Sequence, residues 1–338
     1  MSLNTGSEPP ILQIDKLRIG QGTKAPIVEQ MSLEVRRGET VGLVGESGCG
    51  KSLTALSVMG LLAGNLKVVG GTIRLGGEEI QGLSQRKLRR LRGEKMGMIF
   101  QEPLTALNPV MTIGAQIAEM VRAHRDVSRK AAHERALELL RLVKIPDPEE
   151  RLGEYPHQMS GGMRQRVVIA MAIACNPALL IADEPTTALD VTVQAQILEL
   201  LASLQREENL GLLMITHDLD VVRLVADRIV VMYAGSVVEE GAVEAVLDNP
   251  RHPYTLGLIS ARPTGSFAAG APRLADIRGS VPAPEDRPAG CVFRDRCPYA
   301  QEVCATTRPM LETGQGGHAV RCHFPVDRQT DAPKELAQ

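Results

Sequence analysis

The sequence predicts an α/β fold with a parallel central sheet, followed by a small, irregular, Cys-rich C-terminal region. Apolar strand patterns at 178–183, 210–216 and 228–235 alternate with helical patterns, an order that is typical of parallel sheets. A mainly helical stretch at about 105–160 interrupts this alternation and indicates an inserted helical subdomain. After residue 258 the chain becomes rich in Pro, Gly and Ala, which predicts a linker, and 259–338 is therefore expected to form a separate region.

The first hundred residues carry short strand patterns that are broken by glycine turns. Within them, "TVGLVG" is an apolar strand pattern that ends in glycine. The spacing after it predicts a helix that begins near Lys51, with Leu53, Leu56 and Met59 on one face.

Two further helices have clear sequence signals. Residues 112–145 have apolar residues at helical spacing, with Ser128 as a candidate N-cap. In "DVTVQAQILELLASLQ", Ile197, Leu201 and Leu204 form one apolar stripe, which predicts an amphipathic helix between two of the parallel strands.

Composition limits the class of protein. A length of 338 residues predicts one or two domains, and a formal charge of -2 argues against a general nucleic-acid binder. The N-terminus lacks the pattern of a signal peptide, and no stretch approaches the roughly 18 apolar residues of a membrane helix. We therefore expect a soluble, cytosolic protein, in which clustered cysteines bind metal or react more often than they form disulfides.

"GESGCGKS" (45–52) matches the phosphate-binding pattern G-x-x-x-x-G-K-S/T between a strand and a helix. Its glycines let backbone N–H groups surround phosphates, and the helix N-terminus adds positive potential. Lys51 is expected to reach the β- and γ-phosphates, and the Ser52 hydroxyl to ligate Mg²⁺. The alternative is an ordinary glycine turn before a helix. The predicted nucleotide-binding residues here are Gly45, Glu46, Ser47, Gly48, Cys49, Gly50, Lys51, Ser52 and Leu53.

"LLIADEP" (179–185) is an apolar strand pattern that ends in two carboxylates. Such a strand brings Asp183 to the Mg²⁺ shell and Glu184 to a position where it can polarise an attacking water. An acidic pair that only caps a helix is the alternative, and the nearby phosphate-binding loop makes it the weaker one.

"QMSGGMRQRVVIAMAIA" (158–174) predicts a second anion site. Ser160, Gly161 and Gly162 precede a long apolar helix, whose free N–H groups attract phosphate. Two phosphate-binding surfaces in one chain indicate a head-to-tail dimer. Each nucleotide would lie between the P-loop of one subunit and the Ser-Gly-Gly of the other.

With these motifs in order, residues 11 to about 250 resemble the ATP-binding subunits of ABC transporters. Gln101 in "IFQEP" resembles the Q-loop, "MSGGM" the signature, "TALD" (187–190) the D-loop, and His217 in "THD" the switch histidine. The resemblance implies a P-loop NTPase (RecA-like) core with an antiparallel β subdomain and the inserted helical subdomain, together spanning residues 1–258.

The resemblance also implies roles for the matched residues and a need for ATP and Mg²⁺. Gln101 is expected to contact Mg²⁺ and to couple hydrolysis to transport, Glu184 to act as the catalytic base, and His217 to contact the γ-phosphate. A plain helix N-cap neighbour is the alternative for His217.

The chain departs from the family pattern at two positions. No aromatic residue or histidine precedes Phe100, and the position that usually stacks on adenine falls near Gln21. Loss of one stacking contact weakens adenine binding by about 1–3 kcal/mol, so we expect low selectivity for ATP over GTP. Met163 ends the signature, where Gln is commoner, and removes one polar contact near the nucleotide.

"NPRHPYTLGLI" (249–259), Met163 and the Cys-rich tail resemble the ATPase subunits of oligopeptide/dipeptide importers. This resemblance implies peptide uptake with a second related ATPase subunit, two transmembrane permease subunits and an external substrate-binding protein. Nucleic acid is not an expected partner. The expected location is the cytoplasmic face of the inner (plasma) membrane. Alternatives are an importer for nickel chelates or another small solute, a soluble ABC-type ATPase acting on nucleic acid or ribosomes, and a catalytically silent regulatory subunit.

The tail contains four cysteines with the spacing C-x₅-C-x₆-C-x₁₇-C, namely Cys291, Cys297, Cys304 and Cys322. The C-x₂-C pairs of many zinc sites are absent from the sequence, and the spacing matches no common ferredoxin pattern. The resemblance to the peptide-importer branch implies a 4Fe–4S cluster on these cysteines. Zn²⁺ and reduced or disulfide-linked cysteines are the alternatives, with His318 and His323 as possible substitute ligands.

Overall fold

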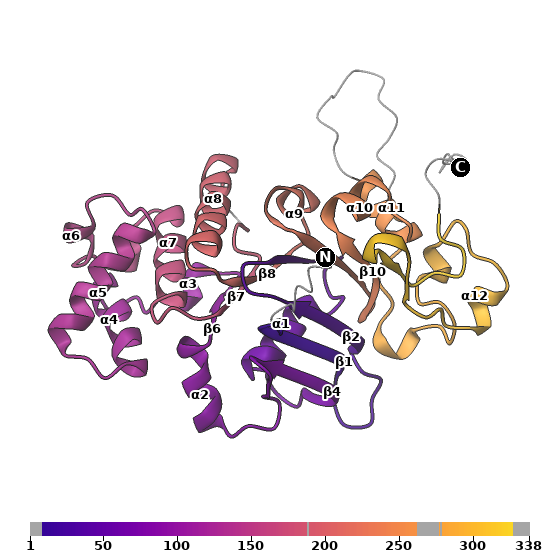
Figure 1. The fold of residues 1–338 in the computed structure, drawn as a ribbon, viewed down its shortest axis with the longest axis horizontal. Helices are drawn as coiled ribbons and strands as arrows, with labels where there is room; N and C mark the ends of the chain where they lie inside the picture. The colour runs from indigo at the N-terminus through magenta and orange to yellow at the C-terminus, as the bar shows by residue number, and fades with distance from the viewer. Residues whose placement is uncertain (1–8, 188, 262–276, 278, 327–338) are drawn as a thin grey trace, which may run out of the picture.

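The computed structural model describes residues 9–187, 189–261, 277 and 279–326. Residues 262–276 of the predicted linker lie outside the described residues. A helical part, a central sheet and the Cys-rich region lie one after another along the longest axis of the molecule (Figure 1). Among the described residues, no helix is both long and apolar enough to cross a membrane.

An eight-stranded sheet in the order β11-β12-β10-β9-β3-β8-β7-β6 forms the centre of the molecule. The strands from β9 to β6 are parallel, which confirms the predicted α/β class. Strands β7 and β8 are buried at every position, which explains why their sequences are continuous apolar runs. The bounds are β3 (Thr40–Val44), β6 (Met96–Ile99), β7 (Leu179–Asp183), β8 (Gly211–Thr216), β9 (Arg228–Tyr233) and β10 (Ser236–Ala242).

A second sheet has the order β2-β1-β4-β5 and is antiparallel throughout, which confirms the predicted antiparallel β subdomain. It packs over helix α1 (Lys51–Met59), and one apolar cluster joins both sheets. As predicted, α1 begins at Lys51, and Leu53, Leu56 and Met59 all pack against this cluster. Met59 is buried and the two leucines are partly buried, and Thr54, Ala55 and Val58 are buried as well. The strands are β1 (Leu12–Gly20), β2 (Val28–Val35), β4 (Lys67–Leu75) and β5 (Glu78–Glu79).

Helices α3 to α7 lie together at one end of the molecule (Figure 1). Ser128 caps α5 as predicted, because its Oγ accepts a hydrogen bond from the Ala131 N–H at 3.1 Å. The predicted stripe of Ile197, Leu201 and Leu204 is buried on α8. The bounds are α2 (Gln85–Glu94), α3 (Pro103–Ala106), α4 (Ile113–His124), α5 (Arg129–Leu142), α6 (Pro148–Arg151), α7 (Gly161–Ala172), α8 (Val191–Glu207), α9 (Leu219–Val225), α10 (Val243–Asp248) and α11 (Pro253–Ser260).

The Cys-rich region is mainly irregular, yet it extends the central sheet through two short strands that the sequence did not indicate. Strand β12 (Ala319–Val320) pairs with β10, and β11 (Glu312–Thr313) pairs with β12. Two-residue strands are too short to give an alternating pattern, so only the fold reveals them. The remaining elements are α12 (Val303–Thr306) and the 3₁₀ helices η1 (Pro156–Gln158), η2 (Pro284–Asp286), η3 (Arg294–Arg296) and η4 (Gln315–Gly317).

Candidate active site

The P-loop connects β3 to α1, as the sequence predicts. Gly50 is the N-cap of α1 with φ +108°, and Gly45 leaves no space for a side chain, since a Cβ there would lie 2.1 Å from the Met232 carbonyl oxygen. Lys51 Nζ donates hydrogen bonds to the carbonyl oxygens of Gly45 at 2.7 Å and Glu46 at 3.0 Å. The lysine charge is therefore held at the loop that surrounds phosphate. The remaining loop residues, Ser47, Gly48 and Cys49, lie between these anchors, and Leu53 follows in the first turn of α1.

Two of the three predicted Mg²⁺ ligands are adjacent, and the third, Gln101, donates a hydrogen bond to Glu184. Ser52 Oγ donates a hydrogen bond to Asp183 Oδ1 at 3.1 Å, which joins the start of α1 to the end of β7. Burial raises the pKa of the Asp183 carboxyl, and the hydrogen bond from Ser52 opposes this effect. A hydroxyl and a carboxylate are oxygen ligands of the kind that Mg²⁺ prefers, so the donor set fits this ion.

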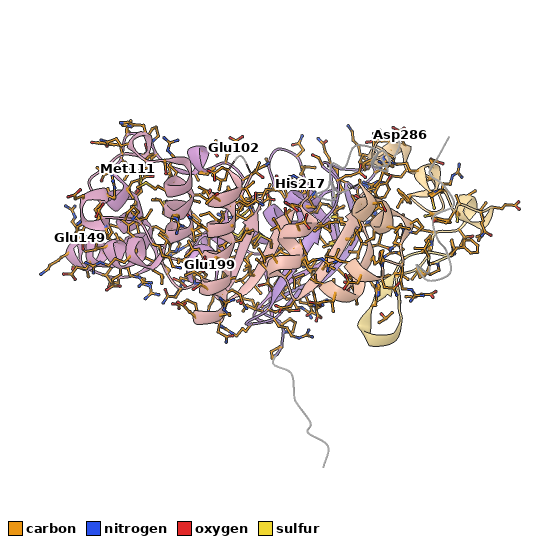
Figure 2. The ribbon with its side chains drawn as sticks, turned by 90° about the horizontal axis from the view of Figure 1, so that it is seen from above. Glu102, Met111, Glu149, Glu199, His217 and Asp286 are labelled. Carbon is orange, nitrogen blue, oxygen red and sulfur yellow. The ribbon has the colours of Figure 1, made fainter. Side chains whose placement is uncertain are left out.

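Glu184 lies at the centre of three predicted motifs. Gln101 Nε2 and Thr187 Oγ1 donate hydrogen bonds to its Oε2 at 3.0 and 2.9 Å, and His217 Nδ1 lies 3.2 Å from Oε1. The backbone of Glu184 has φ +48°, the left-handed conformation that non-glycine residues adopt mostly at constrained sites. The His217 side chain is 65% exposed and lies between the helical end, marked by Glu149, and the side of Asp286 (Figure 2).

The pKa values of the two neighbouring carboxyl groups are shifted in opposite directions. Burial acts to raise the pKa of Glu184, but hydrogen bonds from Thr187 and His217 outweigh it, and the pKa lies below its usual value. The pKa of Asp183 is raised. Glu184 is therefore ionised at neutral pH, the state that a general base requires.

Ser160, Gly161 and Gly162 form the start of α7 and lie apart from this cluster. Ser160 Oγ accepts a hydrogen bond from the Met163 N–H at 3.3 Å, which makes it the N-cap. In the described part of the chain, no hydrogen bond or ion pair joins these three residues to the P-loop or to Glu184. The sequence placed them on a second surface, and this separation is compatible with that prediction.

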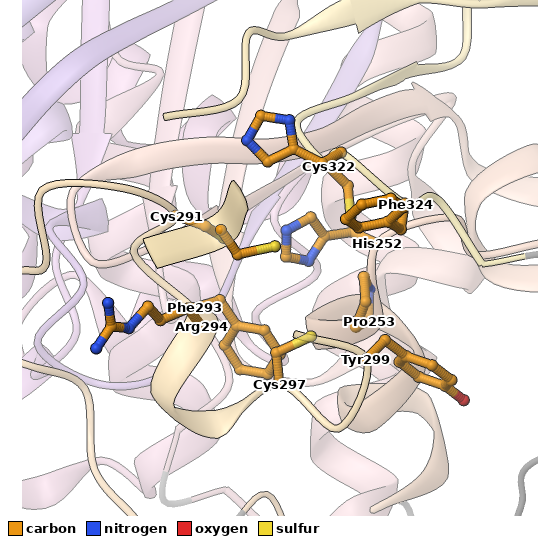
Figure 3. A pocket seen from close by; sticks show the side chains of 11 residues that line it. His252, Pro253, Cys291, Phe293, Arg294, Cys297, Tyr299, Cys322 and Phe324 are labelled. Carbon is orange, nitrogen blue, oxygen red and sulfur yellow. The ribbon is translucent and has the colours of Figure 1, made fainter. Parts of the chain in front are cut away.

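The four tail cysteines line one pocket, together with Phe293, Tyr299 and Phe324. In Figure 3 the sulfur atoms of Cys291, Cys297 and Cys322 point toward the same space. The Cys291 N–H donates to the Cys304 carbonyl oxygen at 2.9 Å, which ties two of the cysteine segments together. The sequence spacing alone did not show that the four thiols would share one site.

The pocket is not pre-formed for a single metal ion. Over the described ranges, no three His, Cys, Asp or Glu side chains form a group that could hold one. Burial, with a smaller effect of the neighbouring cysteines, raises the pKa of Cys297 to about 12 and that of Cys322 to about 11. These groups are therefore neutral thiols at pH 7 until a cation displaces their protons.

The two histidines that the sequence offered as substitute ligands behave differently. His318 is buried and its Nε2 lies 2.7 Å from Glu239 Oε1, outside the residues that line the pocket. His323 lines the pocket, but its Nε2 lies 2.9 Å from the Thr307 carbonyl oxygen. His252 also lines the pocket, and sequence analysis missed it. Burial lowers its pKa to about 4, so its ring is neutral.

Comparison with known families identifies the fold and the tail separately. Residues 28–187 match the family model described as "ABC transporter", and residues 238–304 match "Oligopeptide/dipeptide transporter, C-terminal region". A dipeptide transport ATP-binding protein of Escherichia coli is 49% identical over 320 residues, which cover 94% of this chain and 97% of that protein. The chain belongs to the ATP-binding subunits of ABC transporters.

Other members of the family agree with this assignment. An oligopeptide transport ATP-binding protein of Bacillus subtilis is 49% identical over 88% of this chain and 90% of its own length. Among solved structures, cbiO1 from Clostridium perfringens, part of the ABC transporter complex cbiONQ, has a TM-score of 0.63 at 26% identity, covering 71% of this chain and 92% of that one. The dimeric ATP-binding cassette MJ0796 bound to ADP and phosphate has a TM-score of 0.61 at 28% identity, covering 69% of this chain and 98% of its own. As a member of this family, the chain is an ATPase.

Proposed function

We propose that this ABC ATPase drives the uptake of dipeptides or oligopeptides through separate permease subunits, at the cytoplasmic face of the inner membrane. The observation that carries the proposal is the pairing of the ABC domain with a C-terminal region of the oligopeptide/dipeptide type in one chain. Relatives named for dipeptide and oligopeptide transport align over nearly the whole length and support the same substrate class. We assign residues 1–258 to the nucleotide-binding domain and 259–338 to the linker and Cys-rich region.

The residues of the site have distinct roles in hydrolysis. Lys51 and the P-loop N–H groups hold the phosphates. Ser52, Asp183 and Gln101 would hold Mg²⁺, which would supply positive charge to neutralise the phosphates. Glu184 orients a water and takes its proton, and its lowered pKa keeps it ready to do so. His217 holds Glu184 from one side and is placed to contact the γ-phosphate.

The separation of the signature from the P-loop supports a dimeric mechanism. Ser160, Gly161 and Gly162 of one subunit complete the nucleotide site of the other, so that ATP binding closes the dimer and hydrolysis reopens it. The second subunit is a related ATPase, and two permease subunits and an external binding protein complete the importer.

The test is transport by the assembled importer in proteoliposomes. We expect ATP-dependent accumulation of a labelled dipeptide that requires the binding protein and is abolished by Lys51→Ala. Lys67→Ala, at an exposed position on β4, is the control and retains transport. Accumulation of a nickel chelate without peptide uptake would contradict the substrate class. Nuclease-sensitive association with nucleic acid and no permease would contradict the transporter assignment.

We further propose that the four-cysteine pocket holds a 4Fe–4S cluster. Four thiols from separate segments line one space, which fits the Cys₄ ligation of such clusters. One Zn²⁺ ion on the same thiols is the alternative, and the metal content of the purified chain distinguishes the two. When bound, the cluster supplies the positive charge that keeps four buried thiolates together.

Anaerobic purification of the full-length chain tests this proposal. We expect a broad brown absorption with about four iron and four sulfide per chain. Cys297→Ser should lower both, whereas Cys175→Ser, at a buried position outside the pocket, should not. One zinc per chain, or no metal under anaerobic conditions, would overturn the cluster and leave the ATPase assignment intact.

A further inference from the structure

One side chain reaches from the Cys-rich region into the P-loop. Arg296 is the last residue of η3 and directly precedes Cys297. Its Nη1 donates hydrogen bonds to both carboxylate oxygens of Glu46, at 3.0 and 3.1 Å, and its Nη2 donates to the Ile277 carbonyl oxygen at 2.9 Å. The Arg296 side chain is 7% exposed and that of Glu46 is 28% exposed. This is a largely buried ion pair between two distant parts of the chain.

Glu46 is a sensitive position because it lies within the loop that binds phosphate. Its carbonyl oxygen accepts a hydrogen bond from Lys51 Nζ, and its N–H donates to the Tyr254 hydroxyl at 2.9 Å. The P-loop binds a polyanion, so a carboxylate in the same loop opposes binding unless a cation neutralises it. Arg296 is the cation that pairs with this carboxylate.

An aromatic cluster holds Arg296 in place. Its guanidinium carbon lies 5.7 Å from the centre of the Tyr233 ring. Tyr233 packs against Tyr254 and Phe293, with ring centres 4.6 and 5.1 Å apart. Tyr254 contacts the P-loop and Phe293 lines the cysteine pocket, so the cluster connects the two sites physically.

A second arginine of the Cys-rich region contacts a segment that lies beside the P-loop. Arg287 donates hydrogen bonds to the carbonyl oxygens of Pro26 and Ile27, both at 2.7 Å. The next residue, Val28, packs so closely on the P-loop that a Cβ on Gly50 would lie 2.8 Å from its Cγ2. Within the described residues, the Cys-rich region thus contacts the P-loop through Arg296, which pairs with a charge in the loop, and the neighbouring segment through Arg287.

We propose that Arg296 is a positioning residue for nucleotide, which neutralises Glu46 and thereby lets the Cys-rich region set the affinity of the P-loop for nucleoside triphosphates. The inference rests on nucleotide binding at the P-loop and not on the peptide substrate or on the cluster. Arg296 acts through Glu46, so its effect should appear in binding and not in the chemical step. The contacts of Arg296 given above do not include Glu184 or His217, which carry that step.

The test measures KM for ATP, kcat and the dissociation constant for ATP, using the full-length chain. Arg296→Gln should raise KM and the dissociation constant about tenfold with kcat changed less than twofold, and Arg296→Lys should restore most of the affinity. Arg223→Gln is the control, since Arg223 lies on α9 and pairs with Asp248 rather than with the P-loop or the cysteine pocket. It should leave all three values unchanged.

A double-mutant cycle distinguishes two possible roles of Arg296, namely neutralising the charge of Glu46 and only supporting the P-loop mechanically. Glu46→Gln should not raise KM, and Arg296→Gln should have little further effect in that background. If Arg296 only braced the loop, Glu46→Gln would raise KM as much as Arg296→Gln does, and this result would overturn the proposal. The proposal would also be overturned if the Arg296→Gln variant bound ATP with the same affinity as the control variant. A wild-type chain that fails to bind ATP would contradict the proposed function itself, and thermal unfolding of each variant identifies any that does not fold.

Discussion

Replacement of Glu184 by Gln gives the sharpest test of the catalytic assignment, because the structure predicts that geometry survives while chemistry is lost. The amide oxygen of Gln can occupy the position of Oε2 and still accept hydrogen bonds from Gln101 and Thr187. Its NH₂ group then faces His217 Nδ1, which accepts a hydrogen bond in one neutral tautomer. We therefore expect ATP affinity within about threefold of wild type, since a factor of three corresponds to less than 1 kcal/mol.

Hydrolysis should respond very differently. A positioned general base contributes about 10²–10⁴-fold to rate, so kcat should fall by that factor, which is about 3–5 kcal/mol of activation free energy. The assay is steady-state phosphate release by the assembled importer, with ATP binding measured in parallel. Glu208→Gln, at an exposed position after α8, is the control and should keep full activity. A Glu184→Gln enzyme with more than about a tenth of wild-type kcat would refute the role of Glu184 as base.

Three other outcomes follow from the structure. Asp183→Asn should raise the Mg²⁺ concentration needed for half-maximal hydrolysis by about 10–100-fold, as loss of one partner at a metal site does, and an unchanged Mg²⁺ dependence would remove Asp183 from that site. ATP and GTP should be hydrolysed with kcat/KM values within about tenfold of each other, because Gln21 lies on an exposed turn and offers no aromatic ring for stacking; a strong preference for ATP would show that another residue holds adenine. Glu239→Ala should lower the free energy of unfolding, measured by urea titration, by about 3–5 kcal/mol. The reason is that this fully buried carboxylate accepts hydrogen bonds from the Arg251 and His252 N–H groups and pairs with His318. Glu244→Ala, at an exposed position, is the control and should have little effect.

The amino-acid sequence was sufficient to predict those parts of the site that are formed by a short continuous segment. A P-loop needs glycines at fixed positions, a helix start and one lysine, and all lie within eight consecutive residues. The strand that carries Asp183 and Glu184 is an uninterrupted apolar run because both faces are buried. The contacts of Glu184 were partly predictable, since Gln101 and His217 belong to recognisable motifs. Thr187 was not assigned a role, although it lies only three residues from Glu184 and donates to its carboxylate.

Contacts between segments that are distant in the sequence could not be predicted from sequence patterns. Arg296 and Glu46 have no shared periodicity and no motif that joins them. The same holds for Glu239 and His318, which anchor the tail to β10.

These long-range contacts bear on why a Cys-rich region accompanies this ATPase. Its arginines hold the P-loop and the segment beside it, and the cysteine segments hold the arginines. Cys297 directly follows Arg296 and lines the cysteine pocket, so we expect a group bound by the cysteines to fix the segment that carries Arg296. If so, Cys297→Ser should raise KM for ATP in the same direction as Arg296→Gln, and the two changes together should be less than additive, because both act through one side chain. Independent, additive effects would show that the cysteine pocket and the P-loop are supported separately.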